Sequence, residues 1–221
     1  MNERVLVIVD DAFEMSTLVA ALRLHDIDVI AEAKSESVGM NLLRRLQPDV
    51  VLLDMNVLGI SAVKIAVKMR KENQSIGIVI LTSCSDLRLM GESNDEVPAG
   101  AKILVKKSIV DFTVLCDAIR ESKKAAIEQH KVTWINGNTS FQDHGVATLM
   151  AHLTNTQAEV LRLVANGMTN AQIGRTRYVS EKSVEQVISR VAQELNVQPD
   201  ANMNMRVQLV GEYYRWLGAP H

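Results

Sequence analysis

The chain has 221 residues, enough for one large domain or two small ones with a real core. Its formal net charge of -2 excludes a wholly basic protein of the kind that coats nucleic acid, but it allows a local positive face. Two cysteines exclude a disulfide framework and are typical of reduced thiols. The first apolar run is too short for a signal peptide or a membrane span. We therefore expect a cytoplasmic protein that does not bind a membrane.

Short apolar runs that end in a polar side chain recur through the first 127 residues. The clearest covers residues 50–53 and runs directly into Asp54. A run this short indicates a strand covered on both faces, as in a parallel sheet. Similar runs end at Asp10 and Asp11, at Thr82 and at Lys106. Because ligands bind at the carboxyl ends of such strands, these side chains should surround one crevice.

Stretches with helical spacing separate the strands, for example over residues 61–71 and 109–128. This alternation predicts an α/β fold with a doubly wound, five-stranded parallel sheet, of the flavodoxin-like kind. Residues 84–100 are rich in Gly, Asn, Asp and Ser and contain Pro98, so they should form an irregular loop in place of most of one crossover helix.

The strand and helix alternation stops after residue 127, and the chain from residue 151 onward is helical in pattern. Thr154 with Gln157, and Thr169 with Gln172, have the spacing of capping boxes at helix starts. Further helices are predicted over residues 181–195, after the cap Ser180, and over residues 204–216. We expect an α/β domain over residues 1–127, a linker over 128–150 and a small all-α domain over 151–221.

The predicted crevice has the chemistry of a phosphoryl-transfer site. Asp10, Asp11 and Asp54 would repel one another, so the cluster favours a hard divalent cation with oxygen ligands, and Mg²⁺ is the usual choice. Asp54 can attack a phosphoryl donor to form an aspartyl phosphate. The hydroxyl of Thr82 and the ammonium of Lys106 can then neutralise the transferred group.

This order of residues, each ending an apolar strand, resembles the receiver domain of bacterial two-component response regulators over roughly residues 3 to 122. The resemblance implies that a sensor histidine kinase phosphorylates Asp54 and that Thr82 and Lys106 contact the phosphoryl group. It implies a metal site made of Asp10, Asp11, Asp54 and the backbone carbonyl at Asn56. The chain departs from the family pattern at Leu58, where Pro is usual, at Ile103, where an aromatic switch residue is usual, and at Lys107.

Residues 153–195 resemble the LuxR-type helix-turn-helix domain, so the whole chain resembles a NarL/FixJ-type response regulator. The resemblance implies that the helix after Ser180 lies in the major groove of DNA. Base edges would be contacted by Glu185, Gln186 and Ser189, and phosphates by Lys182, Arg190 and the backbone at Thr169 and Asn170. The predicted DNA-binding set is Thr169, Asn170, Lys182, Ser183, Glu185, Gln186, Ser189 and Arg190.

These features predict a transcriptional regulator that binds promoter DNA, as a homodimer, and is not an enzyme. Tyr213, Tyr214 and Trp216 on the last predicted helix fit either the core or the dimer face, and Tyr213 and Trp216 are the positions at which we expect alanine to weaken the dimer. One alternative is a pseudo-receiver that is not phosphorylated and responds to a ligand or a protein partner. Another is a magnesium-dependent phosphatase or phosphotransferase. The helical domain alone also fits a protein-interaction module.

Overall fold

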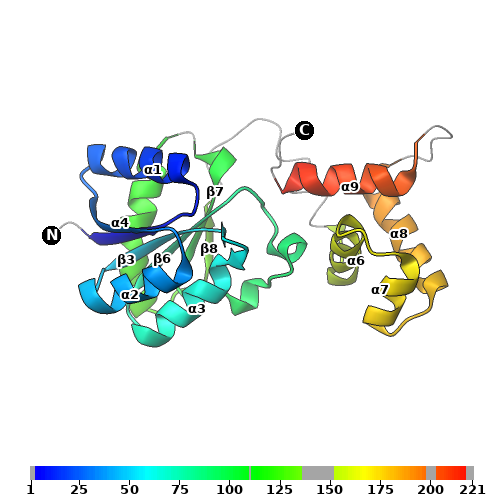
Figure 1. Cartoon of the computed structure of the whole chain (residues 1–221), viewed down its shortest axis with the longest axis horizontal. Coiled ribbons are helices and arrows are strands. Elements are labelled where there is room, and N and C mark those ends of the chain that lie inside the picture. The colour runs from blue at the N-terminus through cyan, green and yellow to red at the C-terminus, as the bar shows by residue number, and fades with distance from the viewer. Residues whose placement is uncertain (1–2, 110, 136–151, 198–202, 218–221) are drawn as a thin grey trace. The chain divides into compact units, whose positions relative to one another are not determined.

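The structure is a computed structural model that describes residues 3–109, 111–135, 152–197 and 203–217 (Figure 1). By its internal contacts the chain divides into two units. One consists of Met1–Ser83 with Asn94–Thr139, and the other of Cys84–Ser93 with Ser140–His221. The predicted domain limits of 1–127, 128–150 and 151–221 stay a prediction, and residues 136–150 of the predicted linker lie outside the described residues.

A fully parallel sheet forms the centre of the first unit, in the order β2-β1-β3-β6-β7-β8. The predicted fold class is confirmed: this is a doubly wound α/β unit followed by a helical one. The strands are β1 (Arg4–Ile8), β2 (Asp28–Ala33), β3 (Val50–Asp54), β6 (Gly77–Thr82), β7 (Lys102–Val105) and β8 (Thr133–Ile135). A short antiparallel pair, β4 (Asn56–Val57) and β5 (Ile60–Ser61), follows β3.

The sheet has six strands rather than the five that the sequence predicts. The additional strand, β8, lies in the stretch predicted as linker and pairs with β7, Trp134 opposite Ile103. Three residues are too few to show an alternating pattern, although their β-branched and aromatic side chains suit a strand. Strand β8 covers the backbone edge of β7, which would otherwise present unpaired N–H and C=O groups.

Helices cover both faces of the sheet (Figure 1). Helices α1 (Ala12–Leu24) and α4 (Thr113–Ile127) bury apolar side chains against the face formed by Val7, Leu52 and Val79. Helices α2 (Glu36–Leu46) and α3 (Ala62–Glu72) lie on the other face, where Gly39 of α2 approaches Ile8 so closely that a Cβ would lie 2.4 Å from the Ile8 Cδ1. The inner strands β1, β3, β6 and β7 are therefore buried on both sides over most of their length.

The predicted irregular stretch over residues 84–100 is confirmed. In place of a crossover helix it contains only two short 3₁₀ turns, η1 (Leu87–Met90) and η2 (Asn94–Glu96). Asp86 begins η1, its carboxylate accepting a hydrogen bond from the Arg88 N–H, and Gly91 ends η1 in the left-handed conformation. A third 3₁₀ turn, η3 (Lys106–Ser108), follows β7.

The second unit is a helical bundle made of α6 (Asn155–Ala165), α7 (Asn170–Arg177), α8 (Glu181–Glu194) and α9 (Met205–Trp216). Both predicted capping boxes are present, at Thr154 and Thr169, and Ser180 caps α8. Gly174 lets the turn before α8 pack against α7, since a Cβ there would lie 2.7 Å from the Val179 carbonyl oxygen. None of the helices in the described ranges is long and apolar enough to cross a membrane.

Candidate functional site

The carboxyl ends of four neighbouring strands bring the predicted phosphoryl-transfer residues to one edge of the sheet. Strands β1, β3, β6 and β7 are adjacent in that order. Asp54 is the last residue of β3 and Thr82 the last residue of β6. Lys106 directly follows the end of β7, and Asp10 comes two residues after the end of β1. The parallel topology thus assembles in space four residues that lie up to 96 positions apart in the chain.

Lys106 is the centre of the polar contacts at this edge. Its Nζ lies 2.6 Å from Asp54 Oδ1 and 2.6 Å from Glu14 Oε1. Burial by itself lowers the pKa of Lys106, but the hydrogen bonds and negative charges of Asp54 and Glu14 outweigh this and raise the pKa overall. The ammonium is therefore charged at neutral pH. Lys107, the next residue along the chain, has an exposed side chain.

Glu14 is a member of this site that the sequence pattern did not reveal. It lies in the first turn of α1 rather than at a strand end, and only the fold brings it to Lys106. Two carboxylates share one ammonium, so the group carries a net negative charge before any phosphoryl group arrives. A cation that neutralises part of this charge would favour the approach of a phosphoryl donor.

Asp10 is held by the backbone of the hairpin that follows Asp54. The Leu58 N–H donates to Asp10 Oδ2 at 2.8 Å. Leu58 and Gly59 form the two-residue turn between β4 and β5, with φ angles of +50° and +79°. Proline, which is usual in the family at this position, could not adopt a positive φ and has no N–H to donate. Leu58 can therefore form this turn where proline could not, and its N–H fixes the carboxylate of Asp10.

The remaining predicted metal ligands are engaged differently. Asp11 caps α1, its Oδ1 accepting from the Glu14 N–H at 2.7 Å, and the Asn56 side chain is exposed in β4. Among the residues that the structure describes, no three His, Cys, Asp or Glu side chains lie close enough together to hold a metal ion. The carboxylate oxygens of Asp10 and Asp54, at the ends of adjacent strands, nevertheless have the donor chemistry that Mg²⁺ prefers.

Thr82 and Ile103 complete the site. Thr82 is buried, with 1% of its surface exposed, at the end of β6. Ile103 is also fully buried, in the middle of β7. Its aliphatic side chain lacks the aromatic ring of the switch residue that is usual at this position.

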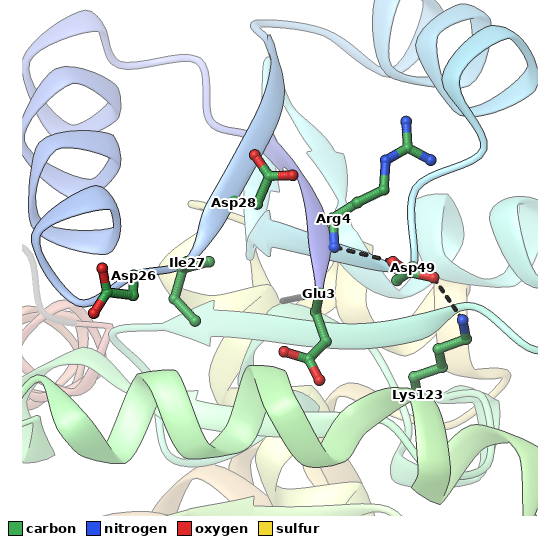
Figure 2. A pocket seen from close by; sticks show the side chains of 7 residues that line it. All are labelled: Glu3, Arg4, Asp26, Ile27, Asp28, Asp49 and Lys123. Atoms are coloured by element: carbon green, nitrogen blue, oxygen red, sulfur yellow. Dashed lines mark hydrogen bonds and ion pairs between the residues drawn. The ribbon is translucent and has the colours of Figure 1, made fainter. Parts of the chain in front are cut away.

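An open hollow of about 710 Å³ lies at the opposite, amino-terminal end of the sheet. Figure 2 shows Asp49 at its wall, where it accepts from the Arg4 N–H and pairs with Lys123 Nζ at 2.5 Å. Burial alone would raise the pKa of Asp49, but Lys123 and the Arg4 N–H lower it overall. This carboxylate therefore ties the starts of β1 and β3 to α4, away from the strand ends that carry the predicted chemistry.

Helix α8 presents a polar face opposite its buried one. Val184, Ile188 and Val191 pack in the core of the second unit. The exposed side chains on the other face follow helical spacing at positions i, i+3, i+4, i+7 and i+8. They are Lys182, Glu185, Gln186, Ser189 and Arg190. Five of the eight predicted DNA contacts thus share one stripe of α8.

The other predicted contacts lie at helix starts. Ser183 is half-buried and hydrogen-bonds with Ser180 at the start of α8, and Thr169 caps α7. The side chain of Asn170 accepts from Arg206 Nη1 at 2.8 Å, which leaves its backbone N–H as the group for a phosphate. Tyr178, which the sequence pattern did not single out, is 96% exposed in the turn before α8.

Two family models match the chain. The model of the response regulator receiver domain matches residues 5–120, and that of the bacterial regulatory proteins of the luxR family matches residues 151–206. The transcriptional regulatory protein LiaR of Bacillus subtilis is 32% identical over 203 residues, which cover 88% of this chain and 91% of that protein. The nitrate/nitrite response regulator protein NarP of Escherichia coli is 30% identical over 178 residues, 77% of each chain.

Solved structures share the fold. The chain is similar to that in a structure of two RcsB dimers bound to two parallel DNAs, with a TM-score of 0.59, 18% identity and coverage of 98% of this chain and 100% of the other. It is also similar to RcsB of Salmonella enterica serovar Typhimurium bound to a promoter in the presence of the phosphomimetic BeF3-, with a TM-score of 0.57, 17% identity and coverage of 96% and 98%. At these identities the comparison concerns the fold alone.

Proposed function

Because the chain belongs to the DNA-binding transcriptional response regulators that join a receiver domain to a LuxR-type helix-turn-helix domain, we propose that Asp54 is its phosphoacceptor. Phosphorylation control is typical of such relatives, which are transcription regulators and not enzymes. The observation that carries the proposal is the contact of Lys106 Nζ with Asp54 Oδ1 at the carboxyl ends of adjacent strands. Magnesium-dependent labelling by acetyl phosphate, read by intact-mass spectrometry, tests it.

In the proposed reaction an oxygen of Asp54 forms a bond to phosphorus, and the donor leaves with the bonding electrons. The donor in the cell is the phosphohistidine of a sensor histidine kinase, as the family implies. Lys106 then turns its ammonium from the Asp54 carboxylate to the phosphoryl oxygens, and Thr82 donates its hydroxyl.

Receiver domains generally bind Mg²⁺ at the phosphorylation site. In this chain Asp10 and Asp54 would hold the ion, with the backbone carbonyl at Asn56, and the ion would supply charge neutralisation for the phosphoryl oxygens. The Leu58 N–H keeps Asp10 aimed while leaving its second oxygen for the ion. Asp11 could coordinate the ion only if its carboxylate released the hydrogen bond that caps α1.

One alternative has a specific observation in its favour. The ammonium of Lys106 already has two carboxylate partners, and Asp11 is used as a helix cap. A pseudo-receiver could keep this arrangement permanently and respond to a ligand or a protein partner instead of a kinase. The phosphatase reading is set aside, because the relatives are regulators of transcription.

We propose that the exposed stripe of α8 reads promoter DNA, so that the protein acts in the cytoplasm, where that DNA lies. A glutamine in the major groove can pair both ways with adenine, and a carboxylate can accept from the amino group of cytosine. Gln186 and Glu185 are therefore assigned to sequence preference. Lys182 and Arg190 are assigned to phosphates, and Tyr178 lies where it can contact the backbone beside them.

Replacing Gln186 with alanine should cost about 1–3 kcal/mol on the preferred DNA and relax the choice at one base pair. Replacing Lys182 with alanine should weaken binding to all sequences alike and lower the salt slope by about one. Selection from random DNA by each variant, followed by titration at several salt concentrations, measures both effects. Gln193→Ala, a glutamine exposed near the end of α8, is the matched control. Altered preference in Lys182→Ala would show that the helix has been oriented wrongly.

We further propose that the chain dimerises on DNA through α9. Tyr213 and Trp216 are only 5% and 6% exposed and belong to the core, so alanine at either position would also disturb folding, and the expectation that it weakens the dimer stays a prediction. The opposite face of α9 presents Val207, 66% exposed, and Tyr214, 44% exposed, with Gly211 between them. These positions lie two turns apart on one side of the helix, which a second copy could cover.

Replacing Val207 with glutamate should weaken the dimer on a two-half-site duplex without unfolding the helix, since the side chain lies in solvent. A charge buried against the same surface of a second copy has no partner and disfavours the interface. Light scattering of the protein with DNA measures the stoichiometry. A wild-type protein that binds one half-site as a monomer, or a variant that dimerises as tightly as wild type, would contradict this assignment.

A further inference from the structure

A second open hollow, of about 650 Å³, lies at the amino-terminal end of the sheet, beside the turns that lead into β6 and β7. It is here called the Arg70 hollow, because Arg70, in the last turn of α3, lines it. Ser75 and Ala99 come from the two turns, and Ile127 from the end of α4. Its volume lies in the range of about 300–1,000 Å³ that is usual for small-molecule sites. Asp54 ends β3 at the opposite edge of the sheet, so the hollow is separate from the proposed phosphorylation site.

Close packing of the backbone fixes the walls of the Arg70 hollow. Gly100 has a φ of +75°, and a Cβ built there would lie 2.3 Å from the Ala125 carbonyl oxygen, so the turn before β7 passes directly against α4. The Gly100 N–H also donates to the His130 carbonyl oxygen at 2.6 Å. In the turn before β6, Ser75 Oγ donates to Asn73 Oδ1 at 2.9 Å. The hollow is therefore built from fixed turns and helix ends, as a preformed binding site would be.

Among the described residues that line the hollow, Arg70 alone is charged. Its Nη1 donates to the Ala99 carbonyl oxygen at 2.9 Å. Its Nε and Nη2 are shielded from water and have no hydrogen-bond partner in the part of the chain that the structure describes. Burial lowers the pKa of Arg70, whereas hydrogen bonds to carboxylates raise the pKa values of Arg44 and Arg88. Arg70 is thus a partly buried cation whose charge no carboxylate of this unit balances.

The two unpaired nitrogens of Arg70 suit one kind of anion. Nε and Nη2 lie along one edge of the planar guanidinium, so their N–H groups point the same way and match the two oxygens of a carboxylate. A buried charged donor without a partner is unfavourable, and a carboxylate would satisfy both donors at once. Helices α3 and α4 both end beside the hollow, and the partial negative charge of helix carboxyl ends disfavours a doubly charged phosphate more than a singly charged group.

The rest of the wall is largely apolar. Pro98, Ala99, Ala126 and Ile127 line the hollow, and Ile127 is 60% exposed although its side chain is large and aliphatic. An apolar group placed there would remove that surface from water, which is favourable. The hollow therefore offers one cationic fork and an adjoining apolar wall, the complement of a small molecule with one carboxylate and an apolar body.

We propose that the Arg70 hollow binds a small organic acid, with its carboxylate on Nε and Nη2 of Arg70 and its apolar body against Pro98 and Ile127. Arg70 keeps its Nη1 bond to the Ala99 carbonyl oxygen, and a small turn of the guanidinium presents the unpaired edge to the ligand. The bound acid would join the end of α3, the turn before β7 and the end of α4. This binding does not depend on phosphorylation of Asp54.

Fluorine NMR of para-fluorobenzoate with the full chain tests the proposal. This probe has one carboxylate on an apolar ring, and para-fluorobenzamide has nearly the same shape without the charge. We expect the fluorine signal of the benzoate to shift or broaden saturably at millimolar concentrations, and that of the benzamide to stay unchanged. Absence of saturable binding of the benzoate to the wild type would overturn the proposal. Displacement of the benzoate by an equal concentration of inorganic phosphate would overturn the assignment to an organic acid.

Substitutions of Arg70 locate the binding. Arg70→Gln should weaken the binding of para-fluorobenzoate roughly ten- to hundredfold, the size set by hydrogen bonds to a charged group. Arg70→Lys should have an intermediate effect, because an ammonium keeps the charge but cannot present two parallel N–H groups. Arg45→Gln is the matched control, because Arg45 is an exposed arginine in the last turn of α2 and does not line the hollow. It should bind the probe as wild type does.

Ile127→Glu keeps the test decisive if Arg70→Gln fails to fold, because it alters a side chain that already lies largely in solvent. The new carboxylate would compete for Arg70 and repel the probe, so we expect binding at least tenfold weaker than in wild type. Circular dichroism of each variant checks its folding. Unchanged affinity for para-fluorobenzoate in Arg70→Gln or in Ile127→Glu would show that the probe binds elsewhere, and the proposal would be overturned.

Discussion

Replacing Asp54 with asparagine is expected to abolish magnesium-dependent labelling by acetyl phosphate. An amide lacks the nucleophilic oxygen of a carboxylate. Among the described residues, Asp54 is the carboxylate that both ends a strand and contacts Lys106. Lys106→Ala should retain the nucleophile but label roughly 10²–10³-fold more slowly, because one charged donor to the developing phosphoryl group is lost. Intact-mass spectrometry with time measures both results.

Glu14→Gln is the control for charge at this site. It removes one of the two carboxylates on Lys106 and leaves Asp54 in place. We expect the variant to be labelled at least as fast as wild type, because Lys106 then has one carboxylate partner in place of two and the site carries less negative charge. Labelling that survives in Asp54→Asn would contradict the assignment. Absence of labelling in the wild type, with a cognate kinase as well as with acetyl phosphate, would favour the pseudo-receiver.

Replacing Leu89 with alanine should lower the free energy of unfolding of the helical unit by about 2–5 kcal/mol. Its side chain is fully buried among residues of α6 and α9, so the substitution leaves a cavity in that core. The chain has two tryptophans, Trp134 and Trp216. In a Trp134→Phe background the fluorescence of buried Trp216 follows the helical unit during urea unfolding.

Leu58→Ala is the matched control for Leu89→Ala. Leu58 is 65% exposed at the tip of the hairpin, so its truncation should change stability by about 0.5 kcal/mol or less. It also keeps the backbone N–H that holds Asp10. If Leu89→Ala leaves the Trp216 transition where it is in wild type, residues 84–93 do not contribute measurably to the stability of the core of the helical unit.

Strand ends were the most informative local signal in this chain. A buried apolar run that stops at a carboxylate, such as residues 50–53 before Asp54, predicts a parallel strand. It also predicts where the functional side chains lie, because the carboxyl ends of parallel strands meet at one edge of the sheet. The irregular stretch over residues 84–100 was equally visible, because its composition opposes helix formation. In the helical unit, Thr154 and Thr169 marked helix starts by a side-chain hydrogen bond that spans only three residues.

Other features depend on contacts between distant parts of the chain. Glu14 lies on a helix, and nothing in its neighbourhood in the sequence indicates that the fold will bring it within 2.6 Å of Lys106. The pairing of β8 with β7 was missed because three residues carry no measurable period. The burial of Tyr213 and Trp216 was also open, since an aromatic side chain at helical spacing suits a core and an interface equally.

By itself the sequence determined the α/β and all-α character of the two parts, the strand-end residues from Asp10 to Lys106 and the polar face of α8, because periodicity, capping and apolar runs act over a few neighbouring residues. Only the tertiary structure decided that Leu58 holds Asp10 and that residues 84–93 join the core of the helical unit. Those outcomes follow from close packing and hydrogen bonding between segments that are remote in the chain, where the partner of each group is set by the whole fold.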